Sequence, residues 1–471
     1  MIAVIDIINE YLWLGIIVLL VGCALYFTFI TRGVQFSMMK DMLKITFCKE
    51  KKNDDDSSSQ DLAQKKIKSI GSFQAFAVAL SSRVGTGNLA GVASAIFVGG
   101  PGAVFWMWIM ALLGSATAFV EATLAQLYKR KGETSFYGGP AYYMQTGLKR
   151  RWMGVLFAVL ITLTFGIANQ IVQSNTLIDA LSNSFGWDKL IVGIILCAAT
   201  LAIIFGGIHR ISHFASLCVP FMAVGFILLS LYVFVTNITT IPSVLQLIFE
   251  EAFGVRQAAG GMVGAAIMQG VKRGLFSNEA GEGSAPNAAA IAHTSHPVKQ
   301  GLIQAFGVFI DTLVICSCTA FIILISGLQN SGYDGIILTT NALESEIGPV
   351  GRYFITAAIF LFAYSTIIAN YFYGETNIRF ITRKKRYVQV FRVFTGAVIV
   401  IGAIVTLQTA WSIVDVCMGI MTAVNLTAIV LLSPKVVTLL KDYKKQKKDG
   451  KNPVFDKEIM PDIKDDLEGW E

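Results

Sequence analysis

Long apolar stretches recur along this 471-residue chain, and they constrain its fold more than any other feature. A helix needs about 20 mostly apolar residues to cross a lipid bilayer. Stretches of this kind lie approximately at 11–30, 71–98, 103–128, 153–180, 189–208, 213–235, 258–290, 300–327, 350–373, 388–407 and 411–433. We therefore expect an all-α protein embedded in a lipid bilayer, with about eleven transmembrane helices.

The composition supports a membrane protein. Only 15% of the residues are charged and 54% are hydrophobic, whereas a soluble domain has about 25% charged residues. The seven cysteines mostly lie in the apolar stretches and show no disulfide spacing. Asp6 and Glu10 precede the first apolar stretch, where a secretory signal would carry positive charges. We therefore interpret that stretch as a retained membrane helix.

The basic residues predict the orientation. Lys and Arg gather at 32–68, 129–151, 379–386 and 435–464. When the chain crosses the bilayer once at each predicted span, these four clusters all lie on the same side of the membrane. Cytoplasmic loops carry such an excess, so the N-terminus is expected outside and the C-terminus in the cytoplasm, in a plasma or inner membrane. Each cluster directly adjoins a predicted span, which argues against a nucleic-acid partner. The polar segment Lys51–Gln60 is expected to be a solvated inner loop.

Two glycine-rich segments do not fit plain lipid-facing helices. They are 81–91, with an arginine and several hydroxyl groups, and 268–287. Glycine destabilises a helix by about 1 kcal/mol relative to alanine, and an unpaired backbone group in hydrocarbon costs several kcal/mol. Interrupted helices at matching places in two halves of a chain indicate a transporter binding site near the bilayer midplane.

The two segments do lie at matching places. Without the first span, ten helices remain, and each segment falls in the first helix of a set of five. Because five is odd, the second set would be inverted relative to the first. We expect an additional N-terminal helix (1–31), a cytoplasmic loop (32–70), a first five-helix repeat (71–235), an extracellular loop (236–257), a second repeat (258–433) and a cytoplasmic tail (434–471) that contributes little to transport.

A broken membrane helix exposes backbone groups that can bind a ligand. A half-helix N-terminus presents free N–H groups that suit a carboxylate, and freed carbonyl groups suit a hard cation such as Na⁺. Gly85 and Gly87 let a ligand approach the backbone closely, while Thr86 adds a hydroxyl and Asn88 an amide oxygen.

Several strings resemble the alanine/glycine:cation symporter family over about residues 10 to 435. They are 82–93, 99–108, 138–144, 273–281 and 284–290. The resemblance implies a monomeric carrier that imports a small neutral amino acid with Na⁺ or H⁺, and not an enzyme. It implies the inverted-repeat fold of the leucine transporter, with one more N-terminal helix. Na⁺ is expected as the coupling ion, and no other cofactor.

The resemblance also implies site residues. Gly85, Thr86 and Gly87 match contacts to the substrate carboxylate, and Asn88 matches a contact to substrate or cation. The expected Na⁺ ligands are the carbonyls of Ser81 and Val84, the side chain of Asn88, and the hydroxyls of Ser365 and Thr366. The complete predicted substrate site is Gly85, Thr86, Gly87, Asn88, Gln170, Gln173, Asn175, Gln269, Gly270, Gly274, Phe276 and Asn370.

The chain departs from the family in one informative place. Many alanine carriers of the family have Gly-Trp where this chain has Ala369-Asn370. Asn370 follows Thr366 by one helical turn and should face the same side. An amide in place of an indole leaves more volume and adds hydrogen-bonding capacity. We therefore hypothesise a pocket that takes glutamine alongside or instead of alanine.

Some residues admit two interpretations. Arg83, Lys272 and Arg273 could contact a ligand or form structural ion pairs with Glu279, Glu282, Asp311 or Glu121. Asp311 and Asp415 could bind a proton or cation, or hold a broken helix in place. His209 and His213 have the spacing of some metal pairs, but a surface role is favoured. The sequence contains no phosphate-binding loop and no catalytic motif, so the alternatives to a Na⁺ symporter are an H⁺-coupled carrier and a channel.

Overall fold

Helices lie at each of the predicted ranges in the computed structural model, which describes residues 2–47, 70–132, 135–254, 260–382 and 384–470. The segment Lys51–Gln60 and the outer-loop residue Arg256 lie outside this part. Seven of the described helical segments are individually long and apolar enough to cross a membrane. The structure therefore supports the all-α membrane fold, and the total of eleven crossings stays a prediction.

The helices of the N-terminal half follow the predicted order. α1 is followed by two short helices, and the second predicted span is divided into α5, the π-helical η1 and α6. The fourth span is one long rod because η2 joins α9 to α10 without interruption. The bounds are α1 (Ile2–Ile30), α2 (Val34–Ser37), α3 (Met39–Phe47), α5 (Ser72–Arg83), η1 (Gly87–Gly91), α6 (Val92–Gly99), α7 (Gly102–Leu127), β1 (Arg130–Lys131), β2 (Phe136–Tyr137), α8 (Pro140–Thr146), α9 (Arg151–Leu163), η2 (Thr164–Ala168), α10 (Asn169–Phe185), α11 (Lys189–Ile204) and α12 (Gly207–Thr236).

The C-terminal half repeats this plan with its own interruption. The seventh predicted span is divided into α14 and α15, and the eighth contains the π-helical η3 between α16 and α17. The bounds are α13 (Ile241–Ala252), α14 (Gly260–Asn278), α15 (Ala285–Ala289), α16 (Pro297–Val308), η3 (Phe309–Cys316), α17 (Ser317–Ile325), η4 (Leu328–Asn330), α18 (Gly335–Ile347), α19 (Pro349–Ile381), α20 (Lys385–Ile401), α21 (Leu407–Lys448), η5 (Lys457–Ile459) and η6 (Pro461–Asp466).

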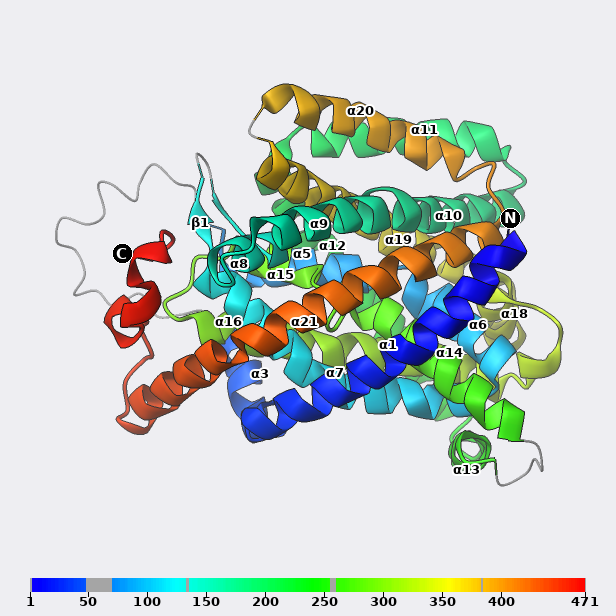
Figure 1. The fold of residues 1–471 in the computed structure, drawn as a ribbon. Coiled ribbons are helices and arrows are strands. Elements are labelled where there is room, and N and C mark those ends of the chain that lie inside the picture. Colours follow the sequence, from blue (N-terminus) through cyan, green and yellow to red (C-terminus); the bar gives the residue numbers. More distant parts are fainter. Residues whose placement is uncertain (1, 48–69, 133–134, 255–259, 383, 471) are drawn as a thin grey trace.

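Helix α7 runs through the middle of the bundle and packs on both α14 and α16. Small residues make these contacts close. Gly301 of α16 is an example, because a Cβ atom there would lie 2.1 Å from the Thr123 hydroxyl of α7. Helices α1 and α21 lie side by side along one face, and α11 and α20 form a pair at another edge (Figure 1). The two broken helices are thereby enclosed by the rest of the bundle.

The start of α1 and the C-terminal tail lie at opposite ends of the molecule (Figure 1). The β1–β2 hairpin and α8 lie at the end with the tail, and α13 and α18 lie at the other. The basic segments around α8 and after α21 thus share one end of the bundle. This arrangement agrees with the charge pattern from which the orientation was predicted.

Among the described residues, α13 and α18 are the longest of the helices that the sequence did not predict. The predicted outer loop 236–257 contains α13, and α18 lies between the eighth and ninth spans. α13 begins with proline at its first turn and packs tightly on α7. A Cβ atom on Gly102 would lie 2.5 Å from the Ala252 backbone nitrogen. Hydropathy missed these helices because each is shorter than a membrane span.

The C-terminal tail is docked on the bundle. The Phe455 N–H donates to the Ser295 carbonyl at 2.8 Å, and the Trp470 indole N–H donates to the Gln126 carbonyl at 3.0 Å. The Lys129 ammonium lies 4.0 Å from the centre of the Trp470 ring and 4.4 Å from that of Phe136. The tail therefore covers the chain that follows α15 and the end of α7.

Candidate functional site

The first interruption lies between α5 and η1. Val84 leaves the helical conformation (φ −78°, ψ 84°) directly after Arg83. The Gly85 N–H donates to the Asn88 Oδ1 at 2.9 Å, and the Thr86 N–H donates to the Gln173 Oε1 at 3.0 Å. Two backbone donors in the centre of the bundle are thus held by side-chain amide oxygens. A substrate carboxylate could accept the same two N–H groups.

Close packing explains the glycines at this interruption. A Cβ atom on Gly85 would lie 2.5 Å from the Thr366 hydroxyl and 3.0 Å from the Gln173 Oε1. A Cβ atom on Gly87 would lie 2.9 Å from the Phe276 ring. Thr86 and Asn88 are fully buried. Helices α10, α14 and α19 therefore close around the backbone of the broken helix.

Three of the predicted Na⁺ ligands lie together. The Thr366 hydroxyl on α19 is 2.8 Å from the Ser81 carbonyl oxygen and 3.4 Å from that of Val84. It is also 2.9 Å from the Phe362 carbonyl of its own helix. With a cation present, the hydroxyl could donate its proton to Phe362 and turn a lone pair to the ion. Oxygen atoms of this kind are the ligands that hard cations prefer.

The other two predicted cation ligands make different contacts. The Ser365 hydroxyl donates to the Phe362 carbonyl at 3.0 Å and lies 3.8 Å from the Met222 sulfur on α12. The Asn88 Nδ2 donates to an Asp311 carboxylate oxygen at 2.7 Å. Asp311 therefore fixes the Asn88 amide, with its oxygen directed to the Gly85 N–H.

The polar residues on α10 differ in what they contact. The Gln170 Nε2 donates to the Ile367 carbonyl of α19 at 2.9 Å, and Gln173 contacts Thr86 as described above. The Asn175 Nδ2 donates to the carbonyls of Gly402 and Val405, beyond the end of α20. Gln173 thus contacts the broken helix and Gln170 contacts α19, whereas Asn175 holds a neighbouring connection.

The second interruption lies within the segment 268–287 that the sequence indicated, but it begins only at Glu279. Helix α14 runs unbroken through Gly270 and Gly274 to Asn278. The chain then turns through Glu279, Gly281 and Gly283, with φ values of 56°, 97° and 84°. α15 begins at Ala285. The connector 279–284 is therefore the real break in this span.

The predicted site residues early in α14 make packing contacts. A Cβ atom on Gly270 would lie 2.5 Å from the Ala103 carbonyl oxygen of α7, and one on Gly274 would lie 3.5 Å from the Met107 Cα. Gln269 packs on Gly99 at the end of α6, where an added Cβ would lie 3.0 Å from the Gln269 Cβ. These glycines allow close helix contact, which is the ordinary role of small residues in membrane helices.

Phe276 belongs to an aromatic and charged group that closes one side of the site. Its ring centre lies 4.5 Å from that of Trp411 on α21. The Arg273 guanidinium lies 4.1 Å from the Trp411 ring centre and makes two 3.1 Å hydrogen bonds to Asp415. The Lys272 ammonium is 2.9 Å from the same carboxylate. Both cations therefore have Asp415 as their ion-pair partner, and neither this pairing nor the contact with Trp411 was expected from the sequence.

Asn370 connects the site to the second break. The Ser82 hydroxyl lies 3.2 Å from the Asn370 Oδ1 and 2.5 Å from a Glu279 carboxylate oxygen. The Asn370 Nδ2, the Gln170 Oε1 and the Thr86 hydroxyl are all buried and have no hydrogen-bond partner. Buried polar groups are nearly always satisfied. Unpartnered atoms on three elements around one broken helix are therefore what an absent polar ligand would leave.

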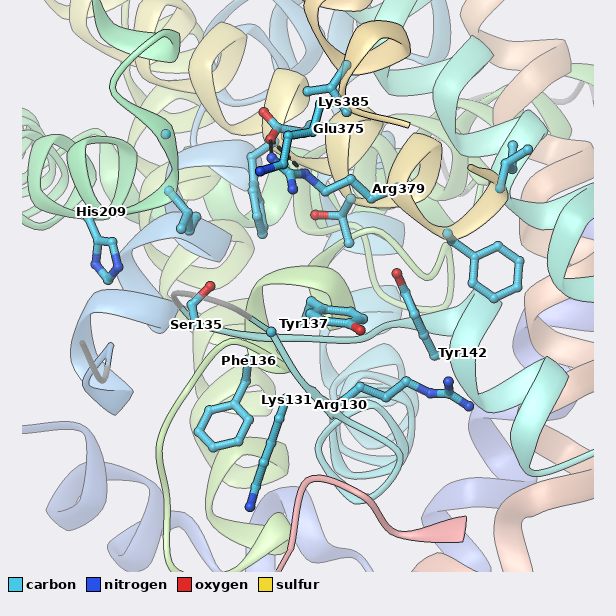
Figure 2. A pocket seen from close by; sticks show the side chains of 18 of the residues that line it. Arg130, Lys131, Ser135, Phe136, Tyr137, Tyr142, His209, Glu375, Arg379 and Lys385 are labelled. Carbon is cyan, nitrogen blue, oxygen red and sulfur yellow. Dashed lines mark hydrogen bonds and ion pairs between the residues drawn. The ribbon is translucent and has the colours of Figure 1, made fainter. Parts of the chain in front are cut away.

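A pocket of about 1140 Å³ lies beyond Asn370 at the end of the bundle that carries the β1–β2 hairpin. Phe372 and Thr376 of α19 contribute to its wall. Figure 2 shows Glu375 and Arg379 on one side and Tyr137 of the hairpin on the other. The pocket is thus an opening on the side predicted to be cytoplasmic, while the centre of the bundle is closed.

No group of three or more His, Cys, Asp or Glu residues that could hold a metal ion occurs within the described residues. His209 lines the pocket just described. This finding agrees with the surface role expected for it.

An interrupted helix that offers N–H groups to one ligand and carbonyl oxygens to a cation defines an ion-coupled secondary transporter. Solved structures share the fold. MhsT in complex with L-phenylalanine gives a TM-score of 0.56 at 15% identity, over 76% of this chain and 88% of that one. A Na⁺-coupled sialic acid symporter in its outward-open state gives 0.54 at 14% identity, over 94% and 92%.

The profile of the sodium:alanine symporter family matches residues 1–457, and the chain belongs to this family. The resemblance found in the sequence is confirmed. The probable sodium/glutamine symporter GlnT of Bacillus subtilis is 51% identical, over 97% of this chain and 94% of that protein. The amino-acid carrier protein AlsT of the same organism is 46% identical, over 100% and 97%. The sodium/alanine symporter AgcS of Methanococcus maripaludis is 36% identical, over 96% and 99%.

Proposed function

We propose that this chain imports glutamine, and alanine as a smaller substrate, together with Na⁺ by alternating access. The observation that carries the proposal is the set of three unpartnered polar atoms around the first break. The Asn370 Nδ2 can only donate, the Gln170 Oε1 can only accept, and the Thr86 hydroxyl can do either. Together they match the carbonyl and NH₂ groups of a glutamine side chain.

The substrate carboxylate is proposed to bind the N–H groups of Gly85 and Thr86. Asn88 and Gln173 now provide the acceptors for these groups. A carboxylate accepts hydrogen bonds more strongly than an amide, so it can displace the Gln173 oxygen. Gln173 would then be free to turn towards the substrate. In this conformation Thr366 and Phe276 pack on Gly85 and Gly87, so the surrounding helices would have to separate before a ligand reaches the backbone.

Na⁺ is proposed to bind the carbonyls of Ser81 and Val84 and the hydroxyl of Thr366. These oxygens come from the broken span and from α19, so a cation would fasten one to the other. Asn88 and Ser365 remain proposed ligands for a sodium-loaded conformation. Because a fastened span positions the N–H groups for the carboxylate, Na⁺ and substrate would favour each other's binding.

The pocket at the end of α19 is the proposed exit. It lies at the same end of the bundle as the tail, and the basic clusters at this end favour a cytoplasmic face. The substrate would pass Phe372 and Thr376, which already line the pocket. We propose a monomer as the transporting unit, with the inverted repeats 71–235 and 258–433 as its moving parts.

A competition experiment tests the substrate assignment. Uptake of labelled alanine by proteoliposomes under a Na⁺ gradient should be inhibited by unlabelled glutamine. The variant Asn370→Leu should weaken glutamine inhibition by roughly tenfold or more, because it removes a buried hydrogen-bond donor. Alanine uptake should change less. An absence of inhibition by glutamine in the unmodified protein would remove glutamine as a substrate.

A further inference from the structure

Among the residues that the structure describes, one buried carboxyl group accepts no hydrogen bond at either oxygen. Glu282 lies in the connector 279–284, is 1% exposed, and has both carboxylate oxygens without a partner. An ionised carboxylate buried without a donor costs several kcal/mol. The carboxyl group therefore carries a proton in this conformation.

The neighbouring carboxyl groups of Glu279 and Glu121 differ from that of Glu282 because each of them accepts hydrogen bonds. The Glu279 oxygens each accept a hydrogen bond at 2.5 Å, one from the Ser82 hydroxyl and the other from Ser284. Glu121 of α7 accepts from the Gly281 N–H at 3.2 Å.

Glu121 also accepts from the Asn425 Nδ2 at 2.9 Å. The charges of Glu279 and Glu121 both reach Glu282, as does that of Arg83, and the hydroxyls of Tyr143 and Tyr373 lie near Glu121. Of the three glutamates, Glu282 alone accepts no hydrogen bond from the described part of the chain.

Arg83 provides the complementary half of an ion pair that is not formed here. It is the last residue of α5 and is 1% exposed. Its Nη1 donates to the Gln304 carbonyl at 3.0 Å, while its Nε and Nη2 have no partner. A guanidinium with two free donors can bind both oxygens of a carboxylate. Loss of the proton from Glu282 would create that carboxylate.

The geometry favours a proton over a metal ion at Glu282. A metal cation needs several oxygen ligands, and the Glu282 oxygens have no polar group within hydrogen-bond distance. A proton needs one oxygen only. The pair that would replace it joins the end of α5 to the connector after α14, which are the two breaks of the transport site.

We propose that Glu282 is a proton-binding site that loads and unloads once in each transport cycle, with Arg83 as its partner in the unprotonated state. The step is the reversible addition of H⁺ to the Glu282 carboxylate, and no other bond changes. This inference rests on the proposed function, since it adds proton movement to Na⁺-driven uptake. Glu279 relays the state of the connector to the substrate site, through Ser82 and Asn370.

The experiment uses the full-length protein in proteoliposomes containing a trapped pH-sensitive dye, with the membrane potential clamped. Labelled glutamine or alanine is added under a Na⁺ gradient, and uptake and internal pH are recorded together. The unmodified protein should show a pH change that starts with uptake and disappears without Na⁺. Glu282→Gln, which mimics the protonated group, should lose the pH change but keep Na⁺-dependent exchange of internal for external amino acid.

Two further variants complete the design. Glu282→Asp keeps a titratable group and should keep the pH change. Glu346→Gln is a matched control, because Glu346 is a partly buried carboxylate of α18 that accepts a hydrogen bond from the Asn237 Nδ2 at 2.7 Å. It should also keep the pH change.

Uptake by the unmodified protein without a pH change would overturn the inference and leave the proposed function intact. A pH change retained by Glu282→Gln, or loss of exchange in that variant, would also overturn the inference. Absence of Na⁺-driven uptake of either amino acid by the unmodified protein would instead contradict the proposed function.

Discussion

At the scale of single residues, the hydroxyl of Thr366 has the most specific position in the site. It is the one side chain of α19 whose oxygen lies within 3.4 Å of both the Ser81 and Val84 carbonyls. Both carbonyls belong to the end of α5, where the helix stops and its last acceptors have no helical donor. A cation ligand from another helix is the natural way to satisfy such acceptors.

Thr366→Val should therefore weaken the apparent affinity for Na⁺ by about tenfold, because one ligand of the cation is lost while the side-chain shape is kept. The measurement is the Na⁺ concentration that gives half-maximal amino-acid uptake. Thr395→Val is the matched control, since the buried Thr395 hydroxyl bonds only the Phe391 carbonyl of its own helix α20. Equal Na⁺ dependence in the two variants would exclude Thr366 as a ligand.

Asn88 is expected to act through geometry. Its amide joins the Gly85 N–H to Asp311, so Asn88→Ala would remove this link and leave the buried Asp311 Oδ1 without its side-chain donor. Na⁺-dependent uptake should be lost while the protein is still produced and inserted. Quantified protein in isolated membranes provides the control. Normal uptake by this variant would show that the amide does not organise the break.

At the scale of elements, the connector 279–284 depends on glycine. Gly283 has a φ of +84°, and an added Cβ would lie 2.8 Å from both the Phe157 ring and the Pro140 ring. Both the strained backbone and the contact oppose a side chain there.

Gly283→Ala should therefore lower the melting temperature of the purified protein, at a cost of about 2 kcal/mol or more. Gly207→Ala is the control, because Gly207 has a φ of +71° with no atom within 4 Å of an added Cβ. It should cost about 1 kcal/mol. Equal melting temperatures for the two variants would show that the connector is not tightly packed.

The docked tail has a pH dependence of its own. Burial, with a smaller contribution from the charge of Lys131, lowers the pKa of Lys129 from 10.5 to about 7. The unfolded chain binds this proton at every pH below 10.5, whereas the folded protein binds it only below about pH 7. Stability should therefore decrease as the pH falls between these values, and the full loss is present below pH 7.

Limited proteolysis of the tail should consequently be faster at pH 6 than at pH 9. Lys129→Met should reduce this difference, and Lys384→Met, at an exposed position, should not. The same pH response in both variants would show that another group controls the tail.

At the scale of the whole molecule, the sequence predicted the all-α membrane fold and the ranges of its long helices. Hydropathy located the long helices because lipid demands continuous apolar stretches. Glycine content identified the first break correctly. The second break, 279–284, lies within the indicated segment 268–287, but Gly270 and Gly274 of that segment serve helix packing, which has the same sequence signature as a break. The helices α13 and α18 and the docked tail depend on tertiary contacts that periodicity does not reveal.

A site residue could be predicted from the sequence where its residue type has a single structural role at that position. Gly85 and Thr366 lie next to each other, and their roles in binding stay predictions, while Asn175 contacts a neighbouring connection. The carboxyl groups near Arg83 are predicted from the sequence as its possible partners, whereas the role of Trp411 required the structure. Ion-pair partners such as Asp415 come from spans far apart in the chain, and one sequence does not show which of several charges will meet.

We propose that the broken second span holds an amino acid and Na⁺ at the same time. The most direct measurement is uptake of labelled glutamine and alanine by proteoliposomes under an imposed Na⁺ gradient, for the unmodified protein and Thr366→Val. Uptake should be saturable, should stop when an ionophore collapses the gradient, and should need more Na⁺ in the variant. Uptake that is indifferent to the Na⁺ gradient, or that does not saturate, would contradict the account.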